Sequence, residues 1–294
     1  MPCSAVTLSL ATITSIIAVA LLAIAFTTDN WLYVEVKRTN IQNYLSRHSD
    51  VQSQALLDSV NSKYYYFTRT KGLFRVCYPK ERPPAVKTYL SPVETHCNNV
   101  NYYIPDENNE TRDFTEDAWT RLHMGRSMIA LFIISFLSVF AAFCTGVTGC
   151  WRRSPGNITA TAILMLLACL LSAGAMGLWH GVEYYEKEKV VGEEFYQQWS
   201  NILQENSDVM YDWSFVLAWL GVFSCLGASL LFFFGSCCLF TEKDKEQLNN
   251  VQYIMPVYPQ KQQYAYASYP VAAPQPYPGG PYYTQGSAYG PYNY

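Results

Sequence analysis

The chain has 294 residues, of which 50% are hydrophobic and 15% are charged, and its formal net charge is −3. Its mean hydropathy of −0.01 would suit a soluble protein of one or two domains, yet four long stretches contain no charged residue. A single charge at mid-bilayer costs roughly 2.5–3.5 kcal/mol on insertion scales, so the four stretches indicate membrane spans and argue against a soluble enzyme or a nucleic-acid-binding protein.

The stretches without Asp, Glu, Lys or Arg are each long enough to cross a bilayer, which takes about 20 apolar residues. They cover residues 7–26, 127–151, 154–179 and 213–241. We therefore predict a short cytoplasmic N-terminus (1–6), transmembrane segments (7–26, 127–150, 158–180 and 213–240), extracellular loops (27–126 and 181–212), a cytoplasmic turn (151–157) and a cytoplasmic tail (241–294).

The first span has a competing interpretation as a cleaved signal peptide, because Ala23-Ile24-Ala25 resembles a signal-peptidase site. The apolar run is longer than the roughly 7–15 residues of a signal peptide, and no Lys or Arg precedes it. We therefore favour a retained helix. Charge does not decide between the two, since a cleaved chain would start on the same side of the membrane.

The first loop contains four stretches that favour strands. Residues 30–37 alternate and are rich in β-formers, and further strand candidates are 63–68, 72–78 and 93–103. Between the first two, residues 49–60 place apolar side chains at near-helical spacing behind Ser49, a plausible helix cap. The loop is thus predicted to be a small antiparallel sheet with a helical insertion.

Two features support placing this loop outside the cell. Of nine cysteines, only Cys77 and Cys97 fall in a predicted extracellular segment, and an even pair in an oxidising compartment predicts a disulfide, with two free thiols as the alternative. Closing a loop of this size contributes about 3 kcal/mol in the chain-entropy model. Asn109 begins an Asn-Glu-Thr sequon, a glycosylation acceptor that functions on the lumenal side.

The four spans are predicted to pack together as a helix bundle. Arg152 and Arg153 lie in the short turn between the second and third spans, and short basic loops stay in the cytoplasm. Gly177 and Gly181 have the four-residue spacing that lets helices approach closely. Since no span carries an intramembrane charge or a broken polar centre, we predict no ion pathway, voltage sensor or transporter.

The second loop contains eight acids and two lysines. His180 and Glu183, at its start, resemble a metal pair but lack a third ligand, so we predict no metal site. The chain has no nucleophile elbow, no phosphate loop and no paired carboxylates with a recognisable partner. The sequence therefore predicts a protein that is not an enzyme and needs no cofactor.

Cysteines and tyrosines mark the predicted cytoplasmic side. Cys150, Cys237 and Cys238 end two spans and are candidates for palmitoylation, with plain packing as the alternative. Residues 251–294 include eleven tyrosines, eight prolines and one charged residue, a composition that predicts a disordered tail able to serve as a scaffold ligand. The terminal Tyr292-Asn293-Tyr294 is a candidate PDZ ligand without the usual small aliphatic end.

The order of residues in the first loop resembles the claudin superfamily signature, which has Trp, then Gly-Leu-Trp, then two cysteines. Here these are Trp31, Gly72-Leu73-Phe74, Cys77 and Cys97, and Arg126 is similar to an arginine that the family places at the mouth of the second span. Phe74 replaces a Trp, and both the Trp-to-Gly gap and the cysteine spacing are longer than in true claudins. The match is therefore to the broader superfamily of claudins, peripheral myelin proteins and stargazin-like proteins, and the long loop and tail favour insect septate-junction proteins of the Pasiflora type.

The resemblance implies a left-handed four-helix transmembrane bundle that carries a small extracellular antiparallel β-sheet, with strands from both loops. It also implies that Trp31 and the Gly72-Leu73-Phe74 turn anchor the sheet at the membrane surface. This suits their apolar or amphipathic character, since Trp prefers the bilayer interface.

The function implied is that of a claudin-like component of occluding junctions, septate or tight, which supports a paracellular barrier at lateral contacts of the plasma membrane. Expected partners are the lipid bilayer, further copies of the chain, other junctional membrane proteins and a cytoplasmic scaffold, but no nucleic acid. The alternative is an auxiliary subunit of a channel or receptor, because the second loop, with a net charge of −6, could engage a cationic surface.

Overall fold

The computed structural model describes residues 3–48, 54, 57, 68–79, 96–103, 115–190 and 199–254. The chain forms two units, Met1–Asn250 and Val251–Tyr294. Several predictions lie outside the described residues: the sequon at Asn109, the terminal residues Tyr292 and Tyr294, nearly all of the strand at 63–68, and most of the helix at 49–60.

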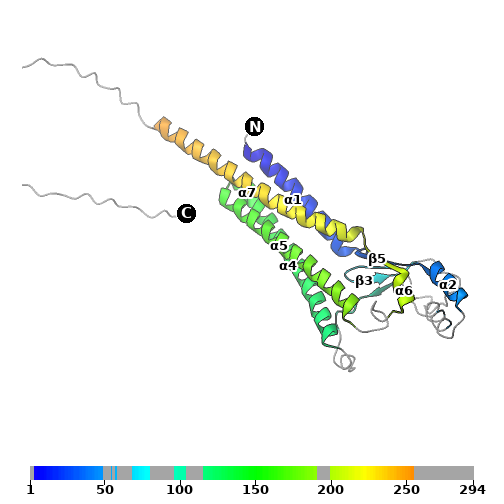
Figure 1. Ribbon diagram of the computed structural model, residues 1–294. Helices are drawn as coiled ribbons and strands as arrows, with labels where there is room; N and C mark the ends of the chain where they lie inside the picture. Colours follow the sequence, from blue (N-terminus) through cyan, green and yellow to red (C-terminus); the bar gives the residue numbers. More distant parts are fainter. Residues whose placement is uncertain are drawn as a thin grey trace, which may run out of the picture. The chain divides into compact units, whose positions relative to one another are not determined.

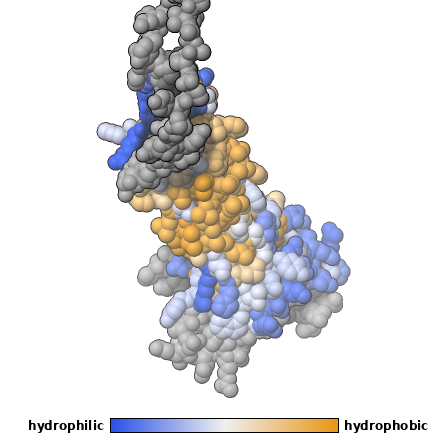
Figure 2. Space-filling view, turned by 90° about the vertical axis from the view of Figure 1, so that its left-hand side faces the viewer, coloured by the Kyte–Doolittle hydropathy of each residue, from blue (hydrophilic) through white to orange (hydrophobic). Residues whose placement is uncertain are grey.

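Four long helices are apolar enough to cross a membrane, which confirms the predicted four-span architecture. They are α1 (Cys3–Thr27), α4 (Glu116–Arg152), α5 (Pro155–Glu188) and α7 (Trp213–Ile254), and they run side by side (Figure 1). Their outward side chains form a hydrophobic band between hydrophilic regions (Figure 2). The protein is therefore a multi-pass membrane protein.

Three of these helices extend well beyond the uncharged windows. α4 begins eleven residues before the predicted span of 127–150, capped by Thr115, whose hydroxyl accepts from the Ala118 N–H at 3.3 Å. α7 continues to Ile254, so it extends past the predicted span of 213–240 and through the first residues of the predicted cytoplasmic tail. Residues 241–250 are mostly good helix formers without Gly or Pro, and the next Pro is at 256.

Hydroxyl groups and small residues join neighbouring helices. Ser135 of α4 donates to the Ala168 carbonyl of α5, and Ser229 of α7 donates to the Ala162 carbonyl of α5, both at 2.9 Å. α1 lies so close to α7 that a Cβ added at Gly221 would be 2.7 Å from Leu22 Cγ. These contacts place α7 between α1 and α5.

The glycine pair predicted to let helices approach does not do so. A Cβ added at Gly177 would meet no atom within 4 Å. At Gly181 it would meet the methyl group at the end of the Met124 side chain. The close approach occurs instead at Gly221, because that residue faces α1 directly.

An antiparallel five-stranded sheet lies beyond one end of the bundle, in the order β4-β3-β2-β1-β5 (Figure 1). The predicted stretches 30–37, 72–78 and 93–103 each contain one strand, whereas β2 starts just after 63–68. The second loop supplies β5. The strands are β1 (Leu32–Val36), β2 (Arg69–Lys71), β3 (Arg75–Cys77), β4 (Cys97–Asn99) and β5 (Ser207–Tyr211).

Two short helices give the sheet a second core. α2 (Arg38–Arg47) follows β1, and α6 (Asn201–Glu205) precedes β5. Leu32, at the start of β1, belongs to the bundle core, whereas the residues farther along the same face pack against α2 and α6. α2 was not predicted from the sequence, because most of its residues are polar. This second core consists of Val34, Val36, Ile41, Leu45, Trp199 and Leu203.

Candidate functional site

Trp31 joins the sheet to all four transmembrane helices. Its side chain is fully buried, and its indole N–H donates to the Ala25 carbonyl of α1 at 2.7 Å. The ring centroid lies 6.1 Å from that of Phe132 in α4, 5.1 Å from Trp179 in α5 and 6.3 Å from Phe215 in α7. Aromatic pairs at these separations add to the stability gained by burial.

This placement corrects the interpretation of Trp31 as a membrane-surface anchor. The ring contacts protein on every side, and its exposed fraction is 0%. The indole N–H, which an interfacial Trp would offer to headgroups, bonds to a helix carbonyl instead. Trp31 therefore attaches the sheet to the bundle rather than to the lipid.

The Gly72-Leu73-Phe74 turn, between β2 and β3, packs beside Trp31. Leu73 is fully buried, and the Phe74 ring meets the Phe26 ring of α1 edge-on at 5.1 Å. Gly72 lies directly against the backbone of Asp29, where an added Cβ would be 2.4 Å from Asp29 Cα. Only glycine fits that position without a shift of the main chain.

We expect Gly72→Ala to destabilise the protein by about 1–3 kcal/mol, the usual cost of forcing extra atoms into a packed site. The matched control is Gly177→Ala, which meets open space and favours the helix by about 1 kcal/mol over glycine. Thermal unfolding in detergent measures both. Equal midpoints for the two variants would contradict the close approach at Gly72.

Tyr102 and Arg126 fasten the segment after β4 to the bundle. The Tyr102 hydroxyl donates to the Leu73 carbonyl at 2.6 Å, and Arg126 Nε donates to the Tyr102 carbonyl at 2.8 Å. The Tyr102 ring lies over Gly125, where a Cβ would be only 3.0 Å away. Burial, assisted by the negative charge of Glu186, raises the pKa of Tyr102 to about 12. The phenol therefore remains a donor at neutral pH.

A disulfide joins Cys77 of β3 to Cys97 of β4, residues that are direct partners in the strand register. It lies beside Asp29, whose carboxylate also pairs with Arg75 at 2.7 Å. The bond thus closes the edge of the sheet at the point where the sheet meets α1.

Cys77→Ser is expected to remove about 3 kcal/mol of stabilisation and to reduce delivery to the cell surface. Cys144→Ser, at an exposed free cysteine of α4, is the matched control. Surface biotinylation measures delivery, and mobility on non-reducing gels reports the disulfide. Normal surface levels of the Cys77 variant would contradict a structural role for this bond.

A buried ion network holds β2 against α4 and α5. Glu186 of α5 accepts from Lys71 of β2 and, at 2.7 Å, from Arg121 Nε of α4. The three side chains keep only 16–25% exposure. The Lys71 ammonium also lies 5.7 Å from the centre of the Trp179 ring, a favourable cation–π geometry. Burial lowers the pKa of Lys71 despite the neighbouring carboxylate.

The residues of this network, together with Asp29 and Tyr102, were not predicted from the sequence. Lys71 directly precedes the Gly72 turn, and Arg121 lies five residues before Arg126, so both flank signature positions. Nothing in the sequence indicates that Glu186, rather than any of the other acids in the second loop, completes the network.

His180 and Glu183 lie at the outer edge of the sheet, next to Tyr211 of β5. The Tyr211 hydroxyl donates to the Glu183 carboxylate at 2.7 Å and lies 3.3 Å from His180 Nδ1. Burial and the Glu183 carboxylate raise the pKa of Tyr211 to about 12. Among the described residues, no group of three or more His, Cys, Asp or Glu side chains could hold a metal ion.

The cysteines proposed for palmitoylation lie at the opposite end of the bundle. Cys150 and Cys237 are exposed free thiols. Cys238 is instead paired with Cys3, with Cα atoms 5.9 Å apart, because α1 begins beside α7 at this level. Acylation of Cys150, Cys237 and Cys238 stays a proposal.

A four-helix membrane bundle with a disulfide-bonded sheet locked on one end defines a claudin-like tetraspan. A sequence model of the PMP-22/EMP/MP20/Claudin tight junction family matches residues 16–234, nearly the whole of the bundle and sheet. The chain therefore belongs to the PMP-22/EMP/MP20/Claudin family. A search of curated proteins found no significant match.

Proposed function

We propose that this tetraspan is a structural component of an occluding cell junction, septate or tight, and supports its paracellular barrier. The observation that carries the proposal is the contact of Trp31 with all four helices, which fixes the sheet to the bundle. A preordered extracellular surface binds its neighbours without the cost of ordering itself. The proposed role is adhesive and non-enzymatic.

The proposed location is the plasma membrane at lateral cell contacts, with both termini in the cytoplasm. The basic turn at Arg152 and Arg153 supports this orientation, because short basic loops remain on the cytoplasmic side. The proposed protein partners are further copies of the chain, other junctional membrane proteins and a scaffold that binds the tail.

The alternative function, an auxiliary subunit of a channel or receptor, relied on the acidic second loop. Four of its acids have partners within the chain. Glu186 pairs with Lys71 and Arg121, Asp208 pairs with Lys37 at 2.6 Å, Glu183 accepts from Tyr211, and Asp212 accepts from Asn30. Two of these carboxylates, Glu186 and Asp208, have their charge balanced by ion pairs within the chain, and the other two have neutral hydrogen-bond donors, so they are less available to an outside cationic partner, which favours the junctional role.

Depletion in a polarised epithelium, followed by rescue, tests the proposal. The tagged wild-type chain is expected at lateral contacts, depletion is expected to let a tracer dye cross the layer, and the wild type is expected to restore exclusion. Exclusion of the tracer after depletion, with the protein absent from lateral contacts, would overturn the proposal. Co-purification of a stoichiometric channel would favour the alternative.

A further inference from the structure

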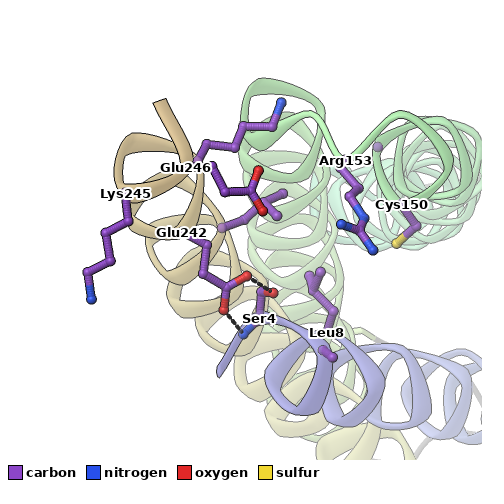
Figure 3. A pocket seen from close by; sticks show the side chains of 11 residues that line it. Ser4, Leu8, Cys150, Arg153, Glu242, Lys245 and Glu246 are labelled. Atoms are coloured by element: carbon purple, nitrogen blue, oxygen red, sulfur yellow. Dashed lines mark hydrogen bonds between the residues drawn. The ribbon is translucent and has the colours of Figure 1, made fainter. Parts of the chain in front are cut away.

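A cavity of about 510 Å³ lies at the end of the bundle opposite the sheet (Figure 3). The first turns of α1, the end of α4 and the polar continuation of α7 surround it. Its volume falls within the range of roughly 300–1,000 Å³ that is typical of ligand sites. None of the signature residues lines it, so it is separate from the site described above.

The cavity lies in the seam between α1 and α4. At the sheet end this seam is closed by the Phe26 ring of α1, whose centroid is 5.6 Å from that of Phe132 and 5.5 Å from that of Phe136 in α4. At the opposite end α1 remains close to α7, where a Cβ added at Gly235 would be 2.8 Å from Leu8 Cδ2. α1 thus follows α7, and the space is left between this pair and α4.

The lining changes from apolar to charged along the bilayer normal. Leu8 and Leu239 lie just inside the ends of uncharged windows, whereas Arg153, Lys243 and Glu246 lie just beyond the ends of such windows. An apolar floor with a charged rim at this level matches the boundary between the tails and the headgroup of a phospholipid.

Charges of opposite sign face the cavity from different walls. Arg153 projects from the end of α4, and Glu242 and Glu246 project from α7 (Figure 3). Glu242 is already engaged, because it accepts from the Ser4 backbone N–H at 3.2 Å and from the Ser4 hydroxyl at 2.5 Å. Within the part of the chain that the structure describes, the Arg153 guanidinium and the Glu246 carboxylate have no hydrogen-bond or ion-pair partner. Both are therefore available to a ligand.

Arg153 also occupies an unusual backbone position. Its φ is 48°, and it is the one non-glycine residue with positive φ among the described residues. It ends α4, at a position where glycine would satisfy the same turn without strain. Since glycine would suit this backbone conformation better, the presence of arginine points to a functional role for its side chain.

We propose that this cavity binds one phospholipid whose headgroup carries a primary amine. The phosphate lies against Arg153 and Lys243, the ammonium group donates to Glu246, and the start of an acyl chain lies along Leu8 and Leu239. Basic residues near a membrane attract any anionic lipid, and that attraction does not require a carboxylate such as Glu246. Selectivity for lipids with a primary amine therefore distinguishes the proposed site from general electrostatic attraction.

Native mass spectrometry of the full-length protein in detergent, titrated with defined lipids, tests the proposal. Phosphatidylethanolamine and phosphatidylserine are expected to bind about tenfold more tightly than phosphatidylcholine or phosphatidylglycerol, because the first two have an N–H donor for Glu246 and the others have none. Soluble phosphoethanolamine, which lacks acyl chains, is expected not to compete at lipid-matched concentrations. Equal binding of phosphatidylcholine, or tighter binding of phosphatidylglycerol, would overturn the proposal, and effective competition by phosphoethanolamine would overturn the acyl-chain contact.

Three variants assign the effect to this cavity. Glu246→Gln is expected to abolish the preference for the amine, and Arg153→Gly, which suits the left-handed backbone, is expected to weaken all four lipids about tenfold. Asp244→Asn is the matched control, because it removes a carboxylate from an exposed position on the same stretch of α7 that does not line the cavity. Unfolding midpoints equal to wild type show that each variant is folded. Retention of the preference in a folded Glu246→Gln protein would overturn the site.

Discussion

Glu186→Gln is expected to destabilise the protein by about 3 kcal/mol. Neutralising Glu186 leaves Lys71 and Arg121 buried without their counter-charge, and removing one partner from a buried ion pair costs roughly 3–5 kcal/mol. We take the lower end of that range because the three side chains keep 16–25% exposure. Thermal unfolding of the purified protein in detergent measures the loss.

The matched control is Glu188→Gln, which removes the same charge one half-turn farther along α5 at an exposed position. It is expected to change stability by less than about 0.5 kcal/mol. The double variant Lys71→Met with Glu186→Gln is expected to lose less than the sum of its parts, because removing both charges leaves a smaller unpaired charge. Equal losses at Glu186 and Glu188 would contradict a stabilising role for the network.

The sequence predicts the parts of this fold that are defined by composition or by short motifs. Absence of charge identifies the four spans because any charge within them would be costly. Gly72 identifies the turn between β2 and β3, because the close backbone contact there requires glycine. Cys77 and Cys97 identify the disulfide, because only cysteine can form one. The resemblance to the family then orders these parts correctly.

Features that depend on tertiary contact were not predictable in the same way. β5 forms only because β1 offers it a full register, from Leu32 opposite Tyr211 to Val36 opposite Ser207. α2 has few apolar residues, but Ile41 and Leu45 are buried by α6 and the sheet, which come from distant segments. The charge pattern of the second loop suggested a free anionic surface, whereas folding pairs Glu186 internally.

Trp31→Ala is expected to cost about 3–5 kcal/mol, the usual loss when a fully buried Trp is truncated. The cavity would form where the sheet meets all four helices, so we also expect the sheet to loosen from the bundle and surface delivery to fall. Trp31→Phe keeps an aromatic ring but removes the donor to Ala25, and it is expected to cost about 0.5–1.5 kcal/mol for the hydrogen bond. Unfolding midpoints in detergent and limited proteolysis of the sheet measure these effects.

Trp151→Ala provides the matched control for the loss of an indole. Trp151 is the last residue but one of α4, at the other end of the bundle, and is 88% exposed, so its truncation opens no cavity in the protein. The expected order of destabilisation is Trp31→Ala, then Trp31→Phe, then Trp151→Ala. If Trp31→Ala and Trp151→Ala had the same midpoint, with the sheet equally resistant to protease, Trp31 would not be the residue that fastens the sheet. The sheet proposed to mediate junctional adhesion would then be held by its other contacts with the bundle, namely the Gly72-Leu73-Phe74 turn, the Arg126–Tyr102 hydrogen bond and the Glu186 network.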